Sequence, residues 1–294
     1  GDIINNSANA TGQAISMDLA IGTSSTGIIN TAAGNITLSG NLSGTGSLIK
    51  VGNSTLTLSG ASKSLSGSLT INNGTVLLSG GGMNSNDITV NSGATLRTGS
   101  ASFVVSNTSK TLTLNGGTFD IQGAYDEPGY IVMNNGTITG TSGGQILAKG
   151  GWTGNGNNTI SNRVSLESTK SGSDIFNIQS GTTTINATVY NYMNRYLGLT
   201  KNGAGTLVLS GNNSYGSSTA GSTLNNGTLV LNHANALGAA GNLWTIVSGT
   251  LDNRSGSALT LTNNSIQNWN GSFTFNGTND LNIGTGAVTM NASR

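Results

Sequence analysis

The five-residue sequence Gly-Thr-Leu-Val-Leu occurs twice, at Gly205–Leu209 and again at Gly227–Leu231. Similar elements begin at Gly249 and Gly271, so the four glycines are evenly spaced along the chain. A repeat of about 22 residues is typical of a solenoid, in which each unit buries its apolar face only against its neighbours. Earlier elements carry threonines at a similar but less even spacing, at Thr55, Thr75, Thr95, Thr118, Thr137 and Thr159.

Within each repeat, apolar and polar residues alternate with period two. Leu207 and Leu209 point to one face of a strand, and Thr206 and Ser210 point to the other. No segment has apolar residues at helical spacing over three turns. A second short alternating segment recurs between these elements, at Leu69–Ile71, Ile88–Val90, Leu112–Leu114, Val164–Leu166 and Leu259–Leu261.

These patterns predict an all-β chain folded as a right-handed parallel β-helix (β-solenoid) with about 20–24 residues per coil. We expect one such domain over residues 1–294, with a less regular interval at 119–198. Glycine and asparagine belong at the corners, where the chain turns with positive φ. The pairs Asn73-Gly74, Asn135-Gly136 and Asn226-Gly227 also match glycosylation sequons, but the pattern favours turns.

Composition excludes several classes of protein. Hydrophobic residues make up 34% of the chain and form regular clusters, which a disordered chain lacks. Charged residues make up 7% and the net charge is +1, so no basic stripe is available for nucleic acid or for an anionic membrane. There is no cysteine, which excludes disulfides and thiolate metal sites. We therefore expect no cofactor, no metal site, no nucleic-acid partner and no membrane contact by this segment.

The segment Leu199–Leu231 contains the series L-x-K-x-G-x-G-T-L-x-L-S-G-x-N-x-Y followed by a second Gly-Thr-Leu element. This series resembles the passenger-associated repeat of autotransporter proteins. A weaker copy covers Leu48–Leu78, in which one glycine and the tyrosine of the motif are missing. The segment Trp269–Met290 is also similar to the part of such passengers that follows the repeat.

The resemblance implies export and an extracellular or outer-surface location in a Gram-negative-type bacterium. It also implies that the chain is a fragment of a longer passenger. The family motif concerns folding and secretion and has no catalytic residues to transfer. A polar, low-charge surface rich in Ser, Thr, Asn and Gly independently favours an extracellular protein.

Some parallel β-helices are polysaccharide lyases or hydrolases, which need acids that converge on one face. The ten acids of this chain are scattered. Asp126 and Glu127 are adjacent, but Pro128-Gly129 predicts a turn in which both are solvated loop charges. An enzyme would require Asp120, Asp126, Glu127 and Glu167 to meet in space. The single His233 is expected near a turn, so we predict no catalytic residues and no enzymatic activity.

The aromatic residues of the irregular interval offer a second type of site. Tyr125, Tyr130 and Trp152 lie near carboxylates in the sequence, a combination that holds sugars on many protein surfaces. A looped-out insertion whose aromatic side chains cover the edge of the coil is the favoured interpretation. The segment Tyr190–Gly198 has three tyrosines, which either pack a bulge or form an exposed patch.

The leading hypothesis is a non-catalytic structural module, a stiff stalk or surface-fibre segment. Open end coils would allow such a module to associate with other copies. The alternative is an adhesin or glycan-binding passenger that contacts host or matrix glycans through the region around Tyr125–Trp152. A carbohydrate-active enzyme is the remote alternative.

Overall fold

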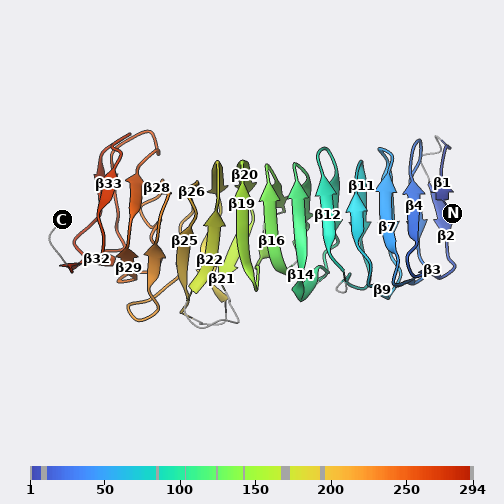
Figure 1. Cartoon of the computed structure of the whole chain (residues 1–294), viewed down its shortest axis with the longest axis horizontal. Helices are drawn as coiled ribbons and strands as arrows, with labels where there is room; N and C mark the ends of the chain where they lie inside the picture. The colour runs from blue at the N-terminus through green and yellow to red at the C-terminus, as the bar shows by residue number, and fades with distance from the viewer. Residues whose placement is uncertain are drawn as a thin grey trace. The chain divides into compact units, whose positions relative to one another are not determined.

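The computed structural model of the chain describes residues 2–7, 12–83, 86–102, 104–123, 125–141, 143–166, 173–192 and 196–291. The chain divides into two compact units, unit 1 (Gly1–Ile146) and unit 2 (Leu147–Arg294). Figure 1 shows the strands of both units, coloured from blue at the N-terminus to red at the C-terminus. The described residues contain no α-helix, so the predicted all-β class is confirmed. It follows that this part of the chain has no helix that could span a membrane. The single domain over 1–294 stays a prediction, as does the hand of the coil.

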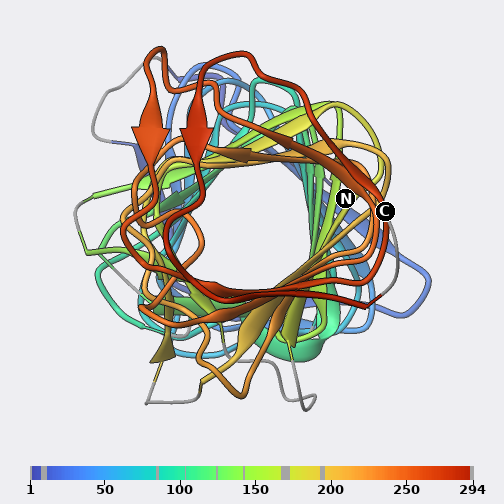
Figure 2. The same cartoon turned by 90° about the vertical axis from the view of Figure 1, so that its left-hand side faces the viewer.

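In unit 1, strands of successive coils pair in parallel and form three sheet faces around a common axis (Figure 2). The first face has β1 (Asp2–Ile4), β4 (Thr26–Asn30), β7 (Ser47–Val51), β10 (Leu69–Ile71), β12 (Ile88–Asn91), β14 (Ser106–Asn115), β16 (Tyr125–Asn134) and β18 (Gln145–Ile146). The second has β2 (Gln13–Ile15), β5 (Ile36–Leu38), β8 (Thr55–Leu58), β11 (Thr75–Leu78), β13 (Thr95–Thr98), β15 (Thr118–Ile121) and β17 (Thr137–Gly140). The third has β3 (Leu19–Ile21), β6 (Leu42–Gly44) and β9 (Lys63–Leu65).

Unit 2 repeats this arrangement, again with parallel pairing between successive coils. Its first face has β19 (Gly151–Asn155), β22 (Ser173–Ile178), β25 (Gly198–Asn202), β27 (Ser222–Leu224), β29 (Leu243–Ile246), β32 (Ile266–Trp269) and β35 (Val288–Met290). Its second has β20 (Asn157–Ile160), β23 (Thr182–Ile185), β26 (Thr206–Leu209), β28 (Thr228–Leu231), β30 (Gly249–Asp252) and β33 (Phe273–Phe275). Two further parallel pairs are β21 (Arg163–Leu166) with β24 (Val189–Asn191), and β31 (Leu259–Thr260) with β34 (Leu281–Asn282). Each unit is therefore a parallel β-solenoid.

The threonine ladder predicted from the sequence is a row of register partners in unit 1. Thr55 pairs with Thr75, and Thr75 pairs with Thr95. The row continues from Thr95 to Thr118 and from Thr118 to Thr137. Coils of different length thus keep one register on this face, because the corners absorb the extra residues.

The predicted register of the last repeat is wrong. Gly249 pairs with Phe273 and Leu251 with Phe275, so this coil is two residues longer than the even spacing of the glycines predicts. Gly271 lies before β33 rather than at its start. A shift of two residues keeps the same side chains on the same face, so the apolar pattern is compatible with both registers.

The core consists of inward rows in which each side chain stacks on its register partner from the next coil. In unit 1 one row runs through Leu56, Val76, Leu96, Phe119 and Ile138, all fully buried. Each such side chain contributes about 1.5–3 kcal/mol relative to an exposed one. In unit 2 the corresponding row becomes more exposed towards the C-terminus, from Leu229 (0%) through Leu251 (7%) to Phe275 (45%).

The predicted Asn-Gly corners are turns with positive φ. Gly74 has φ +65° and Gly227 has φ +72°, which only glycine adopts without strain. At the third corner the asparagine itself has positive φ, since Asn135 has φ +57°. Asparagine tolerates this region better than other non-glycine residues, so all three turn assignments are confirmed.

Pro128 does not lie in a turn, which corrects the sequence-based interpretation of Asp126–Gly129. The ten-residue strand β16 passes straight through it. Proline has no N–H to donate, and it tolerates strands only where the ladder is interrupted. The partner strand β14 supplies that interruption, because its register with β16 shifts between Asn107 and Thr111.

Candidate functional site

Asp120 is held in a local ion pair. Its Oδ2 atom lies 2.7 Å from Nε of Arg97, in the strand before it. Its Oδ1 atom accepts a hydrogen bond of 2.6 Å from Nε2 of Gln122. Both carboxylate oxygens are thus occupied by neighbouring side chains, an arrangement that stabilises the coil edge.

Asp126 is fully buried, so its assignment as a solvated loop charge is wrong. Its Oδ1 atom accepts a hydrogen bond of 2.8 Å from the backbone N–H of Val105. Burial raises the pKa of Asp126 to about 6, although backbone hydrogen bonds from Val105 and Val104 oppose the increase. The neighbouring Glu127 adds to the increase by charge repulsion.

The raised pKa makes stability depend on pH. Between the ordinary value of 3.8 and about 6, the folded protein binds the Asp126 proton more tightly than the unfolded chain does. The free energy of unfolding therefore falls as the pH rises through this window, by about 3 kcal/mol for this group. Urea denaturation at pH 3.5 and pH 7 measures the fall, which Asp126→Asn is expected to remove. An unchanged pH dependence in that variant would contradict the assignment.

The remaining predicted acids do not gather with Asp126. Glu127 lies on the opposite face of β16, where it accepts a hydrogen bond of 3.0 Å from Oγ of Ser106. Glu167 lies outside the described residues. Among the described residues, no group of three or more His, Cys, Asp or Glu side chains is placed to hold a metal ion. His233 lies at a turn, as predicted, and its Nδ1 accepts the N–H of Asn235 at 3.0 Å.

Trp152 lies neither in a looped-out insertion, the interpretation favoured from the sequence, nor in an exposed aromatic platform, the alternative. Trp152 is 4% exposed and points inward from β19. Its ring stacks on that of its register partner Phe176, with ring centroids 5.3 Å apart. In unit 1, Tyr125 is also buried, whereas Tyr130 is 42% exposed. Two of the three aromatic residues therefore serve the cores of their own units.

The three tyrosines predicted to form a bulge or a patch lie in and after β24, and we call this segment, Tyr190–Tyr196, the tyrosine cluster. Tyr196 is 64% exposed, and Tyr190 and Tyr192 are half-buried. The guanidinium carbon of Arg163 lies 4.3 Å from the centre of the Tyr190 ring, which is a cation–π contact. The cluster therefore has one exposed ring, that of Tyr196, and one cation–π contact, at Tyr190.

Lys201, the lysine of the second repeat copy, had no role assigned from the sequence. Its side chain is fully buried in the inward row of β25, between its register partners Phe176 and Leu224. Its Nζ atom donates to the carbonyl oxygens of Asn202 at 2.8 Å, Gly203 at 2.7 Å and Asn226 at 3.2 Å. An ammonium group has three donors, and all three are used at the corner.

Lys50 repeats this geometry in unit 1. It is fully buried, and its Nζ atom donates to the carbonyl oxygens of Val51 at 3.1 Å, Gly52 at 2.7 Å and Asn73 at 2.9 Å. In both copies two acceptors follow the lysine directly, and the third is the asparagine of the next Asn-Gly corner. We call these two sites the lysine corners. Burial lowers the pKa of both lysines to about 8, so at pH 7 each is an ammonium ion tying one coil to the next.

The second copy also has a buried tyrosine at a different corner, between β26 and β27. The hydroxyl group of Tyr215 donates to the carbonyl oxygen of Ala236 at 3.1 Å, and Nδ2 of Asn213 donates to the same oxygen at 2.9 Å. Burial raises the pKa of Tyr215 well above 10. These two side chains occupy the Asn and Tyr positions of the repeat motif, so both motif positions connect successive coils.

The first copy has Ser64 where the motif has tyrosine, and a third buried lysine lies beside it. Lys63 is 4% exposed, and its Nζ atom donates to the carbonyl oxygens of Gly60, Ser79 and Gly81 at 2.7, 2.8 and 2.5 Å. Burial lowers its pKa. A cation therefore connects the coils in the copy that lacks the tyrosine.

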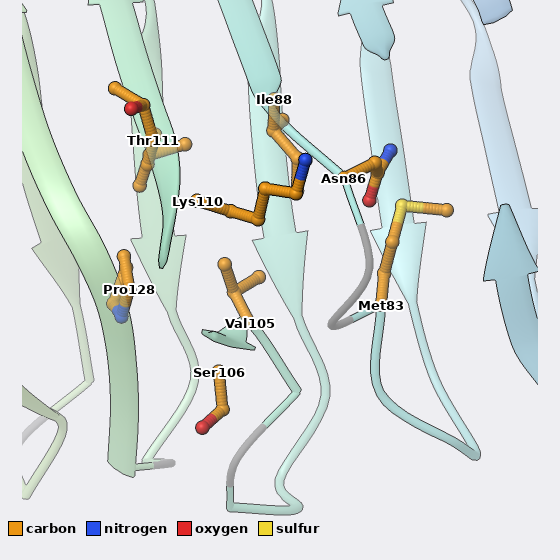
Figure 3. Close-up of a pocket in the computed structure, with 9 residues that line it drawn as sticks. Met83, Asn86, Ile88, Val105, Ser106, Lys110, Thr111 and Pro128 are labelled. Carbon is orange, nitrogen blue, oxygen red and sulfur yellow. The ribbon is translucent and has the colours of Figure 1, made fainter. Parts of the chain in front are cut away.

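A small hollow, with room for about one water molecule, opens beside the start of β12 in unit 1 (Figure 3). Met83, Ile88 and Val105 give it an apolar lining, and Lys110 reaches across it. Asn86 is 3% exposed, and neither atom of its side-chain amide has a hydrogen-bond partner among the residues that the structure describes. Sequence analysis gave no signal for this hollow, because its lining comes from three successive coils.

The unpartnered amide of Asn86 predicts a stabilising substitution. A buried polar group without a hydrogen bond costs about 1–3 kcal/mol. Asn86→Leu, of similar volume and apolar like its neighbours Met83 and Ile88, is therefore expected to raise the free energy of unfolding by about 1 kcal/mol. Thermal or urea denaturation measures this. A lower midpoint in Asn86→Leu would show that the amide is satisfied in solution.

The sequence matches the passenger-associated-transport-repeat at residues 48–78 and 199–231. These two ranges contain both lysine corners, Lys50 with Asn73 and Lys201 with Asn226. No curated protein and no solved structure matches the chain. The chain thus carries two passenger-associated-transport repeats within parallel β-solenoid units, and this combination fits a passenger segment of an autotransporter.

Proposed function

We propose that this chain is a non-catalytic structural segment of an autotransporter passenger, a stalk or surface-fibre segment displayed outside a Gram-negative bacterium. The two matched repeats support the extracellular location. The β-solenoid units support the structural role, since stacked coils add length without needing a separate core for each.

One observation carries this proposal. In both matched repeats the buried charge is used to join coils, because Lys50 and Lys201 each give all three donors to backbone carbonyls of two successive corners. A group saturated in this way has no donor left for a substrate. The repeat motif therefore contributes cohesion along the coil.

Forced unfolding of single molecules tests the structural role. With the chain held by its two ends, a load-bearing solenoid is expected to lengthen in discrete steps, each releasing one coil or a small group of coils. Steps should require the most force where the matched repeats lie. Extension without steps, at forces typical of an unstructured linker, would overturn the proposal.

A second candidate function is glycan binding, favoured by the tyrosine cluster of unit 2. Tyr196 is the most exposed aromatic residue among the described ones, and Arg163 lies over Tyr190, six residues earlier in the chain. An exposed ring offers an apolar surface to a sugar, and the guanidinium group adds donors for an acidic one. The contacts would then come from this cluster rather than from Trp152.

A glycan array distinguishes this candidate from the structural one. Binding that is lost in Tyr196→Ala and retained in Tyr130→Ala, an exposed tyrosine of unit 1, would support it. The absence of any signal from the unmodified chain would remove it.

A further inference from the structure

Near-identical coils create a pairing problem. Strands β26 and β28 have the same sequence, Thr-Leu-Val-Leu, and pair in register from Thr206 with Thr228 to Leu209 with Leu231. A slip of one residue would turn the leucines outward, which burial forbids. A slip of two residues keeps leucine opposite leucine and retains the parallel ladder. The inward aliphatic pattern therefore does not choose between these two registers.

The chain itself shows that a two-residue difference is allowed. In the last coil, the alignment by sequence similarity places Gly271 opposite Gly249, but the structure places Phe273 there. No lysine occupies the inward row of that coil, where the register partners are Ile246 and Trp269. In this coil, sequence similarity and structural register thus differ by two residues, whereas the preceding coil, with Leu224 and Ile246 in the row, keeps Thr228 paired with Thr250.

We propose that Lys201 and Lys50 select the coil register. Each lysine can use all three of its donors only when the next coil places the carbonyl oxygen of its Asn-Gly corner beside the ammonium group. This proposal does not depend on the proposed function. In β25 and β27 the register partners at this position are Lys201 and Leu224, so the two otherwise similar coils differ in one buried charge.

The geometry makes the selection sharp. The Nζ atom of Lys201 lies 3.2 Å from the Asn226 oxygen, and that of Lys50 lies 2.9 Å from the Asn73 oxygen. A strand advances about 3.3 Å per residue, so a two-residue slip displaces the acceptor by about 6.6 Å, well beyond hydrogen-bond reach. The slipped coil would leave a buried ammonium group with an unused donor among apolar neighbours.

The two lysines bind the equivalent corner carbonyl in coils of different length. The coil from Thr55 to Thr75 is two residues shorter than the coil from Thr206 to Thr228. In both cases the acceptor is the asparagine two residues before the paired threonine. The lysine therefore recognises the corner and not a fixed number of residues, as a register-selecting group must. Buried polar groups have this role in coiled coils, where they set the register at some expense in stability.

Cysteine pairs report the register directly, because the natural chain has no cysteine. The native-register pair is Thr206→Cys with Thr228→Cys, whose Cα atoms are register partners. The slipped-register pair is Val208→Cys with Thr228→Cys. In the native register the second pair is diagonal, with Cα atoms about 8 Å apart, too far for a disulfide. Each pair is placed in the full chain, which is then denatured and refolded under mild oxidation.

With Lys201 present, we expect the native pair to form its disulfide and the slipped pair to remain at background. In Lys201→Met, slipped disulfide is expected to rise about tenfold or more. The matched control is Leu224→Met, which places the same residue at the register partner of Lys201. This variant should behave like the natural chain. Lys201→Gln, which keeps two neutral donors, should give an intermediate yield.

A slipped yield in Lys201→Met that equals that of Leu224→Met would overturn the proposal. So would a Lys201→Met chain that forms neither disulfide and recovers no β-sheet circular dichroism. That outcome would make Lys201 a residue required for stability rather than for register. Should Lys201→Met aggregate, Lys201→Gln decides: a slipped yield at background in that variant also counts against register selection.

Discussion

Replacing Gly227 with alanine is expected to lower the free energy of unfolding by about 3 kcal/mol or more. Alanine resists positive φ, and Gly227 has φ +72°. Its added Cβ would also lie 2.5 Å from the carbonyl oxygen of Gly205 and 2.7 Å from Nζ of Lys201. Neither atom can move aside alone, because one belongs to the backbone and the other is held by hydrogen bonds. The whole corner would therefore have to shift. Urea denaturation of the purified chain measures the loss.

The control is Gly241→Ala in the same unit. Gly241 has nearly the same φ, +69°, but nothing lies within 4 Å of its added Cβ. We expect this variant to lose only about 1 kcal/mol, the cost of positive φ alone. If both substitutions lower stability equally, the close approach of coils at the lysine corner is not what constrains Gly227.

Tyr215→Ala is expected to have the second large effect, a loss of about 3–5 kcal/mol. Tyr215 is fully buried, and its hydroxyl group donates to the carbonyl oxygen of Ala236 in the following coil. Truncation therefore opens a cavity and removes one of two hydrogen bonds to that oxygen. Tyr215→Phe keeps the ring and should lose about 1 kcal/mol, because Asn213 still donates to Ala236.

Tyr196→Ala provides the comparison, because Tyr196 is 64% exposed. Its loss should stay within about 0.5 kcal/mol. Denaturation midpoints of the three variants, measured at one pH, give the order directly. A small effect of Tyr215→Ala would mean that the motif tyrosine is not part of the core.

The strands and most of the register could be predicted because the relevant signals are local. The alternation in Leu207–Leu209 fixes which side chains point inward, and the spacing of Thr55, Thr75 and Thr95 gives the pairing. The step to Phe273 could not be predicted, because a two-residue shift preserves that alternation. Corners of variable length decide the register there, and their conformation depends on contacts between coils.

The acids and aromatic residues of the irregular interval were misjudged for a related reason. Trp152 and Asp126 were judged by type and by neighbouring Gly and Pro, which predict loops. In the structure a bulge in the partner strand accommodates Pro128, so β16 continues and carries Asp126 inward. The sequence around Pro128 does not reveal that a bulge in the neighbouring coil accommodates this proline.

The sequence pattern indicates the inward position of the corner lysine but not its hydrogen-bond acceptors. Lys201 follows Leu199 at a spacing of two, so strand alternation places it on the inward face. Lysine is almost never fully buried unless it is paired, and no acid lies nearby in the sequence to suggest a partner. The acceptors are backbone carbonyls, which every residue has, so their convergence at Asn226 appears only in three dimensions.

Nuclear magnetic resonance of the lysine ammonium groups tests the central claim most directly. Slowly exchanging ammonium signals are expected at pH 6 from Lys50 and Lys201, and also from the buried Lys63. The Lys50 and Lys201 signals should show coupling across hydrogen bonds to carbonyl carbons, including those of Asn73 and Asn226 respectively. Ammonium protons at both positions that exchange as fast as those of an exposed lysine, with no such coupling, would contradict it.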